Sequence, residues 1–292
     1  MILNIKVNEV FEGLTIKEFL KEYHVGKGKI EEIRVNKLVT LNYKNASLEE
    51  KLHEDDTLIF DMPEIINFSP SINIVEVVYE YEEILIVNKP SGILIHPDGD
   101  DKNQDTLVNR VAKYYVDKND IREVRYSHRI DVETSGLVLF CKNFLSHAKI
   151  NFEVENHIVL REYRAISEGI YKVKKGKINS PIGRDRHISN KFRVSNSDKS
   201  KDSITNYKVI KEKDNVSLVS CILETGRTHQ IRVHLSSINH PLCGDVLYGG
   251  NKRKINRVAL HSYRIKLINP ITFEEIEVIK DIPLDMKKVI GE

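Results

Sequence analysis

The sequence has few cysteines and no long apolar run. Its three cysteines, Cys141, Cys221 and Cys243, are odd in number and far apart, and no pair has the C-x-x-C spacing. This pattern predicts reduced thiols in a cytoplasmic protein and argues against a disulfide framework or a zinc site. No stretch approaches the roughly 20 apolar residues that span a bilayer, and the first residues lack a signal-peptide core. We therefore expect no membrane association and no secretion.

The sequence also contains no glycine-rich phosphate loop, no internal repeat and no low-complexity tract. Two histidines of its most polar motif, His229 and His234, are five residues apart, and no cysteine lies beside them. That spacing fits no helical pair of metal ligands, and zinc normally takes three or four ligands of this kind. We therefore expect no metal site.

What the chain does contain is typical of a globular protein. Of its 292 residues, 40% are hydrophobic and 30% are charged, and the length is sufficient for two domains, each with a core. The net charge is +2, but residues 1–66 hold 9 basic and 13 acidic residues, so the remainder has a net charge of +6. A basic body would suit a polyanionic partner, and an ordinary solvated surface explains the same number.

The first 61 residues are predicted to form a small module of helices and strands. A helix is expected where apolar residues recur on one face, namely at Ile16, Phe19, Leu20 and Tyr23. A second short helix is expected around residues 30–33, and strands at 39–42 and 57–60. The helical part is rich in bases, and Lys27, Lys29 and Arg34 are candidates for contacts with nucleic-acid phosphates. The alternative is that these are the solvent-facing side chains of an ordinary helix.

The rest of the chain is predicted to be rich in strands. Residues 62–74 carry two prolines and two serines without a hydrophobic period, which predicts a linker before a second domain at 75–292. Short β-prone runs occur at 75–79, 84–87, 137–140, 216–223 and 258–260, and helical patterns at 106–115 and 145–156. This order predicts an α+β fold with a mixed, largely antiparallel sheet.

One carboxylate stands out because of its position before an apolar run. Asp131 lies in the stretch H-R-I-D-V-E-T-S-G, which leads directly into Leu137–Phe140. This apolar run reads as a buried strand that is entered from a glycine-containing turn, so Asp131 is held just outside the core. On residue chemistry alone, capping of a turn is commoner than catalysis for such a residue.

Three further motifs accompany this stretch. N-K-P-S-G at 88–92 ends a strand-like run and is followed by His96-Pro97; alone, it indicates only a turn. R-E-Y-R-A places Tyr163 among charged neighbours, where it would either pack against the core or stack on a nucleobase. T-G-R-T-H-Q-I-R-V-H, at 225–234, is dense in hydrogen-bond donors.

Together, these motifs resemble the signatures of the RluA-like RNA pseudouridine synthases. The resemblance covers about residues 75–283, continues through Gly244-Asp245 and Tyr248-Gly249, and departs from the usual pattern at Ile130, Arg161 and Ser262. It implies an isomerase fold and RNA as the partner, and we expect a monomer. The N-terminal module weakly resembles the small RNA-binding module named after ribosomal protein S-four.

The resemblance also implies roles for individual residues. Asp131 would be the nucleophile, Arg232 would pair with it, and Tyr163 would stack on the target base. We expect a distance of 2.7–3.2 Å between the Arg232 guanidinium and the Asp131 carboxylate if the hydrogen bond is well formed. The expected RNA contacts in this part of the chain are Arg129, His128, Arg227, His229, Gln230 and Lys89. For Arg129, a structural ion pair is the alternative.

The implied reaction breaks the bond between uracil N1 and ribose C1′ and rejoins the ring through C5, so it needs no cofactor. The carboxylate could attack C6 of the base or act at C1′ of the ribose, and the sequence does not choose between them. Family members act on large-subunit ribosomal RNA, on transfer RNA or on both, and the N-terminal module favours ribosomal RNA. The alternatives are a glycoside hydrolase, which normally needs two carboxylates at a set separation, and a non-catalytic RNA-binding assembly factor.

Overall fold

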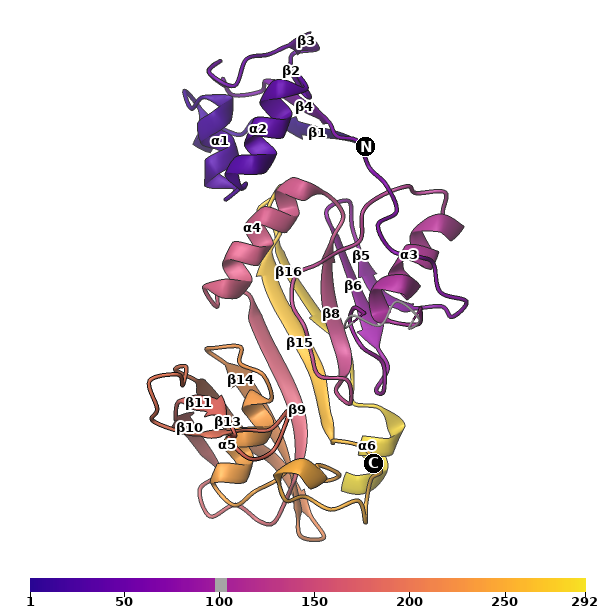
Figure 1. The fold of residues 1–292 in the computed structure, drawn as a ribbon, viewed down its shortest axis with the longest axis vertical. Coiled ribbons are helices and arrows are strands. Elements are labelled where there is room, and N and C mark those ends of the chain that lie inside the picture. Colours follow the sequence, from indigo (N-terminus) through magenta and orange to yellow (C-terminus); the bar gives the residue numbers. More distant parts are fainter. Residues whose placement is uncertain (98–103) are drawn as a thin grey trace.

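The computed structural model describes residues 1–97 and 104–292, and a large mixed sheet forms its centre (Figure 1). The strand order is β10-β13-β14-β9-β15-β8-β6-β5, with β16 beside β15 and β7 beside β8. Only the pairing of β15 with β8 is parallel among these described strands. The predicted α+β fold with a largely antiparallel sheet is therefore confirmed. The strands are β5 Glu76–Glu80, β6 Ile84–Lys89, β7 Arg125–Tyr126, β8 Ser135–Cys141, β9 Leu160–Glu168, β10 Lys175–Asn179, β13 Ile204–Lys213, β14 Val216–Leu223, β15 Leu260–Ile268 and β16 Glu275–Ile279.

Strands β6 and β8 contain continuous apolar runs, Ile84–Val87 and Leu137–Cys141, because helices cover both of their faces. Ile84 and Ile86 of β6 pack on the side of α4, whereas Leu85 and Val87 pack on the side of α3. Side chains alternate between the faces of a strand, so a strand that is buried on both faces reads as a continuous apolar run. The two covering helices are α3 Leu107–Asp117 and α4 Phe144–Glu155. The other helices of the body are shorter, namely α5 Gln230–Ser237, η2 Val246–Tyr248 and α6 Leu284–Ile290.

The N-terminal module, residues 1–61, has its own four-stranded sheet with the order β1-β4-β2-β3. Thr15 caps the first helix: its hydroxyl accepts from the Glu18 backbone N–H, while the Glu18 carboxylate accepts from the Thr15 backbone N–H. The predicted apolar face is confirmed, because Ile16, Phe19 and Leu20 are fully buried. The elements are β1 Ile2–Lys6, η1 Glu9–Phe11, α1 Ile16–Glu22, α2 Lys27–Val35, β2 Val39–Leu41, β3 Lys44–Asn45 and β4 Thr57–Asp61.

The module packs directly against the body. The ring of Phe60 meets Phe144 of α4 at a centroid distance of 5.4 Å, and His24 stacks on Phe152 at 3.5 Å. The Tyr23 hydroxyl donates to the backbone carbonyl of Pro270 at 2.8 Å. The two parts therefore share an apolar core, and the module lies at one end of the long axis of the molecule (Figure 1).

Residues 62–74, which we expected to be a linker, contain no helix or strand. They are nevertheless bonded to the body. The buried Glu64 carboxylate pairs with Arg125 at 2.7 Å, and the Asn67 side chain accepts from the Val124 backbone N–H at 2.8 Å. Among the described residues, no helix is long and apolar enough to cross a membrane.

A small hairpin, β11 (Ile182–Arg184) and β12 (Phe192–Val194), stands apart from the main sheet. It lies near α5, toward the end of the molecule opposite the N-terminal module (Figure 1). The sequence did not predict this hairpin, because its strands are only three residues long and carry no clear alternation.

Candidate active site

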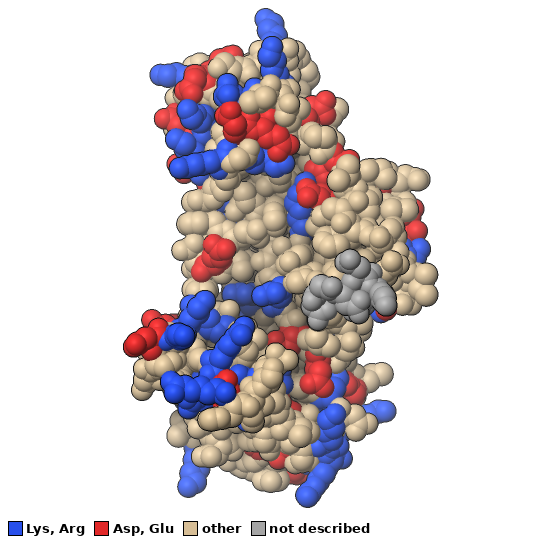
Figure 2. Space-filling view, viewed as in Figure 1, with Lys and Arg blue, Asp and Glu red and all other residues tan. Residues whose placement is uncertain are grey.

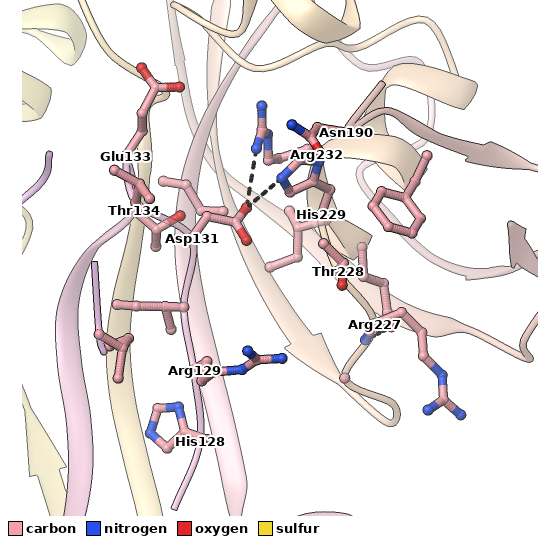
Figure 3. Close-up of a pocket in the computed structure, with 18 of the residues that line it drawn as sticks. His128, Arg129, Asp131, Glu133, Thr134, Asn190, Arg227, Thr228, His229 and Arg232 are labelled. Carbon is pink, nitrogen blue, oxygen red and sulfur yellow. Dashed lines mark hydrogen bonds and ion pairs between the residues drawn. The ribbon is translucent and has the colours of Figure 1, made fainter. Parts of the chain in front are cut away.

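Residues Leu94–His96 and four further segments line an open cleft with a volume of about 800 Å³. The four are the approach to β8, strand β9, the hairpin loop between β11 and β12, and the segment that leads into α5. The sequence motifs that contain Asp131, Tyr163 and Arg232 therefore meet at one site. Figure 3 shows Asp131 and Arg232 facing each other there.

Asp131 stands on a tight turn at the entrance to β8. The Thr134 backbone N–H donates to the Asp131 carbonyl at 3.1 Å, and β8 begins one residue later. Gly136 then has a φ of +109°, and a Cβ at this position would lie 2.3 Å from the backbone oxygen of Ser262. Only glycine allows β8 to approach β15 this closely, so the T-S-G part of the motif seats the turn against the sheet.

The N-K-P-S-G motif holds this turn from behind. The buried Lys89 ammonium donates to the backbone carbonyls of Pro90, Ile93 and Val132 at 2.8–3.0 Å. The Ser91 hydroxyl donates to the Glu133 carbonyl at 2.6 Å. Burial lowers the pKa of Lys89 to about 7. The prediction that Lys89 contacts RNA is wrong, because its side chain is fully buried and all three of its donors are used.

Arg232, at the start of α5, joins two carboxylates. Its Nε and Nη2 donate to Asp245 at 2.7 and 2.9 Å, and its Nη1 donates to Asp131 at 3.3 Å. The contact with Asp131 is therefore present, although it is longer than the 2.7–3.2 Å that we predicted. Burial lowers the pKa of Arg232, but the hydrogen bonds and charge of Asp245 outweigh it and raise the pKa overall.

Asp245 is a site residue whose role was not predicted from the sequence. It is 1% exposed and takes the planar fork of the guanidinium, which leaves one nitrogen of Arg232 for Asp131. The sequence marked it only as part of Gly244-Asp245, one of the matching pieces of the family resemblance, without a role. Nothing local indicated which arginine it would meet.

His229 adds a second polar group beside Asp131. Its Nε2 lies 3.9 Å from Asp131 Oδ2, and its Nδ1 lies 2.9 Å from the Tyr248 hydroxyl. The Phe192 backbone N–H donates to that hydroxyl at 3.0 Å. Among the described residues, the hydroxyl hydrogen then finds an acceptor only at His229 Nδ1, so we assign the ring proton to Nε2, facing Asp131. Burial lowers the pKa of His229, while the Asp131 charge opposes that shift.

Tyr163 lies on β9 at the floor of the cleft. It is 5% exposed and packs with Ile231 and Leu260, and burial raises the pKa of its hydroxyl. The ring is therefore less open than the predicted stacking platform. Arg161 lies two residues earlier on the same strand and also lines the cleft.

Two of the predicted RNA contacts are internal. His128 is 6% exposed, and its Nε2 accepts from the Leu139 backbone N–H at 3.2 Å; burial lowers its pKa to about 3. Gln230 is 3% exposed and bonds to Thr225 and to the backbone of Arg227 and Ile204. This burial contradicts the prediction that they contact RNA. Instead, they hold the segments that carry Asp131 and His229.

Arg129 and Arg227 line the cleft from opposite sides (Figure 3). Arg129 Nη1 lies 3.3 Å from Nε2 of His96, and no carboxylate of the described residues pairs with Arg129, so the expected alternative of a structural ion pair is not seen in this part of the chain. The Nε of Arg227 donates to the Asp202 carbonyl at 3.1 Å. In Figure 3 the carboxylate of Glu133 points away from Asp131, which is not the arrangement of a carboxylate pair.

The other predicted RNA contacts lie on α2, in the N-terminal module and away from the cleft (Figure 1). Lys29 pairs with Glu32 at 2.9 Å, and Arg34 pairs with Glu31 at 2.6 Å. Lys27 is exposed. The structure leaves these side chains accessible without placing them at the site.

The chain is similar to known proteins over nearly its whole length. Residues 83–237 match the family model described as RNA pseudouridylate synthase, and residues 3–58 match the one described as RluD ribosomal pseudouridine synthase N-terminal domain. The RNA pseudouridine synthase YhcT of Bacillus subtilis (strain 168) is 38% identical over 98% of this chain and 96% of its own length. Ribosomal large subunit pseudouridine synthase D of Escherichia coli (strain K12) is 32% identical over 79% of this chain and 74% of its own. Among solved structures, human RNA Pseudouridylate Synthase Domain Containing 1 has a TM-score of 0.61 at 26% identity, over 76% of this chain and 88% of that one.

Proposed function

Because the chain belongs to the RNA pseudouridylate synthase family, we propose that it isomerises particular uridines of large-subunit ribosomal RNA, with Asp131 as the nucleophile. The family and the type of reaction, an isomerisation on RNA, follow from the matches to the family model and to relatives. The target RNA and the residue roles are the proposal.

The observation that carries the proposal is the setting of Asp131. Its side chain is 25% exposed in the cleft, its turn is held by Lys89 and Ser91, and Arg232 contacts one carboxylate oxygen. A nucleophile needs this combination, because it must be reachable by the substrate and yet held in one orientation. A residue that merely capped the turn would not need a buried arginine in front of it.

The reaction is balanced within the substrate. The bond between C1′ and N1 breaks, a bond between C1′ and C5 forms, C5 loses a proton and N1 gains one. Asp131 would act either by adding to C6 of the base or by acting at C1′ of the ribose, and the geometry is compatible with both. Arg232 would hold the carboxylate, and Tyr163 would form the floor under the base.

The target base must leave its stack before it can enter the cleft, which costs a few kcal/mol. Arg129, on the cleft wall next to Asp131, is placed to fill the vacated space or to hold the adjacent backbone. Arg227 would contact the RNA from the opposite wall, and the N-terminal module with Lys27, Lys29 and Arg34 would bind RNA outside the cleft.

Ribosomal RNA is favoured over transfer RNA by the N-terminal match to a ribosomal pseudouridine synthase domain. The test is to map pseudouridines in all cellular RNAs with the gene intact, deleted, and restored as wild type or as Asp131→Asn. Loss of sites in large-subunit ribosomal RNA that only the wild type restores is the expected result. Loss confined to transfer RNA would overturn the substrate, and restoration by Asp131→Asn would overturn the nucleophile.

A further inference from the structure

Three arginines among the described residues are less than a tenth exposed, and one of them differs from the other two. Arg125 pairs with Glu64 and with Glu123, each at 2.7 Å, and Arg232 pairs with Asp245 and Asp131. Arg161 is 6% exposed, and its guanidinium has no hydrogen bond or ion pair to any described residue. Because an unpaired buried charge is costly, an arginine in this state calls for an explanation.

The strand geometry explains why no neighbouring carboxylate neutralises Arg161. The next residue, Glu162, points to the other face of β9, since successive side chains alternate. There it is already engaged by Ser220 at 2.6 Å and by Arg264 at 3.0 Å. Of the other carboxylates that line the cleft, Asp131 is held by Arg232, and Asp185 accepts from the backbone N–H groups of His187 and Ile188. Glu133 points away from Asp131 (Figure 3).

The surroundings of Arg161 are basic and open toward the cleft. Burial lowers the pKa of His128 and of His157, and the positive charge of Arg161 lowers both further. The charge of Arg227 also lowers the pKa of His157. Gly226 borders the guanidinium: a Cβ there would lie 3.5 Å from Nη2 and 3.6 Å from Nη1 of Arg161. The absence of a side chain at this position keeps the two terminal nitrogens accessible from the cleft.

We propose that Arg161 is a phosphate subsite, which binds a phosphodiester of the RNA beside the nucleotide in the cleft. The planar guanidinium can donate two parallel hydrogen bonds to two phosphate oxygens. The bound phosphate would then be the anionic partner that Arg161 lacks among the described residues. The proposal rests on the proposed function for the identity of the ligand as RNA. It goes beyond that function by assigning one phosphate contact to a residue that is buried on the cleft floor.

The first test needs no RNA and uses a matched pair of buried arginines. Arg161→Met keeps the aliphatic length and removes a charge without a partner, so the melting temperature of the full chain should stay the same or rise. Arg125→Met leaves Glu64 buried without its cation, so the melting temperature should fall by several degrees or more. A comparable fall for Arg161→Met would show a structural role and overturn the subsite.

The second test measures binding to a stem-loop RNA with a loop of uridines, made with ordinary phosphates or with uncharged methylphosphonate linkages in the loop. Wild type should bind the ordinary loop roughly 10- to 100-fold more tightly than Arg161→Met does, the range expected for a hydrogen bond to a charged group. With the methylphosphonate loop, this difference should largely disappear. For Arg161→Met on the ordinary loop, the slope of log affinity against log salt concentration should also become shallower, by the amount expected for about one lost phosphate contact.

An equal loss of affinity by Arg161→Met on both loops would mean that Arg161 contacts the base, and it would overturn the phosphate assignment. The outcome is separable from the proposed function, because pseudouridine formation on the mapped RNA is measured independently with wild type and Asp131→Asn. If the RNA is isomerised but the effect of Arg161→Met does not depend on the loop phosphates, only the subsite is contradicted. If that effect depends on the phosphates but no isomerisation occurs, only the proposed reaction is contradicted.

Discussion

The cations of helix α2 and the cations of the cleft are the same residue types in opposite physical situations. On α2, Lys29 and Arg34 are solvent-accessible and pair with glutamates one turn away. In the cleft, Arg232 is buried between two aspartates, and Arg161 is buried without a carboxylate partner among the described residues. Exposed pairs contribute only about 0–1 kcal/mol and are readily exchanged, whereas a buried guanidinium depends strongly on its partner.

The surface shows the same contrast at a larger scale. In Figure 2, acidic and basic residues are interleaved over the N-terminal module, whereas several basic side chains gather at the other end, over the region of the hairpin and α5. Interleaved charges produce a weak field at a distance, and a group of one sign attracts a polyanion. The comparison therefore predicts large effects from changes in the cleft and small ones from changes on α2.

The largest expected effect is that of Asp131→Asn. The substitution keeps the size of the side chain but removes the nucleophile, so pseudouridine formation should fall at least about 100-fold, while RNA affinity and the fold are retained. The measurement is single-turnover conversion of the mapped RNA. Glu133→Gln is the matched control, since its carboxylate lies two residues away and points elsewhere. Residual activity of Asp131→Asn above about one per cent would contradict the assignment.

Arg232→Lys should have the next largest effect. An ammonium keeps the charge, but its single nitrogen cannot donate a pair of parallel hydrogen bonds to Asp245 and also contact Asp131. Turnover should therefore drop roughly 10- to 100-fold with little change in RNA affinity. Asp245→Asn should lower both activity and the free energy of unfolding, because the amide can accept only one of the two hydrogen bonds from Arg232 and carries no charge. A rate near that of wild type for Arg232→Lys would show that the fork is not needed.

Tyr248→Phe should have a smaller effect on turnover, roughly tenfold or less, the scale of one lost neutral hydrogen bond. It removes the hydroxyl that directs the His229 proton toward Asp131 and leaves the Phe192 N–H without this acceptor. The pH dependence of turnover is the decisive measurement. A profile that is displaced relative to wild type is expected, and a uniform loss at every pH would mean that Tyr248 only supports the hairpin.

The smallest effect is expected when Lys27, Lys29 and Arg34 are all replaced by Ala. Affinity for long structured RNA should fall by only a few fold, and its salt dependence should become shallower. Glu31→Gln with Glu32→Gln is the converse variant, which frees Arg34 and Lys29 and should strengthen binding slightly. An unchanged salt slope in the triple variant would leave these residues as solvated surface.

Substitution is the appropriate test of the module because truncation would disturb the body. Phe144 and Leu145 of α4 belong to the same apolar cluster as the module, so its removal would expose them to water. The composition of residues 62–74, with two prolines, did not indicate that this segment is bonded to the body. Its hydrogen bonds are made to residues about 60 positions away, such as Arg125, and local composition cannot show such contacts.

Local patterns determined much of this protein. Alternation and apolar runs predicted β5, β6, β8 and β14 of the body but not β10, β13 or β16. The recurrence of apolar residues on one face predicted α1, and the motifs located Asp131, Tyr163 and Arg232. These features depend on interactions between residues that are close in the chain, and their signals therefore survive in the linear sequence.

Only the tertiary structure determined which charged side chains contact one another. Asp131 and Arg232 are separated by 101 positions, Arg232 gives its fork to Asp245, and Lys89 holds a turn rather than RNA. It also buried Arg161 with no carboxylate partner in residues 1–97 and 104–292. The sequence supplies the cations and anions, but strand register and the face on which each side chain emerges determine their distances, and electrostatic energy depends on distance and burial.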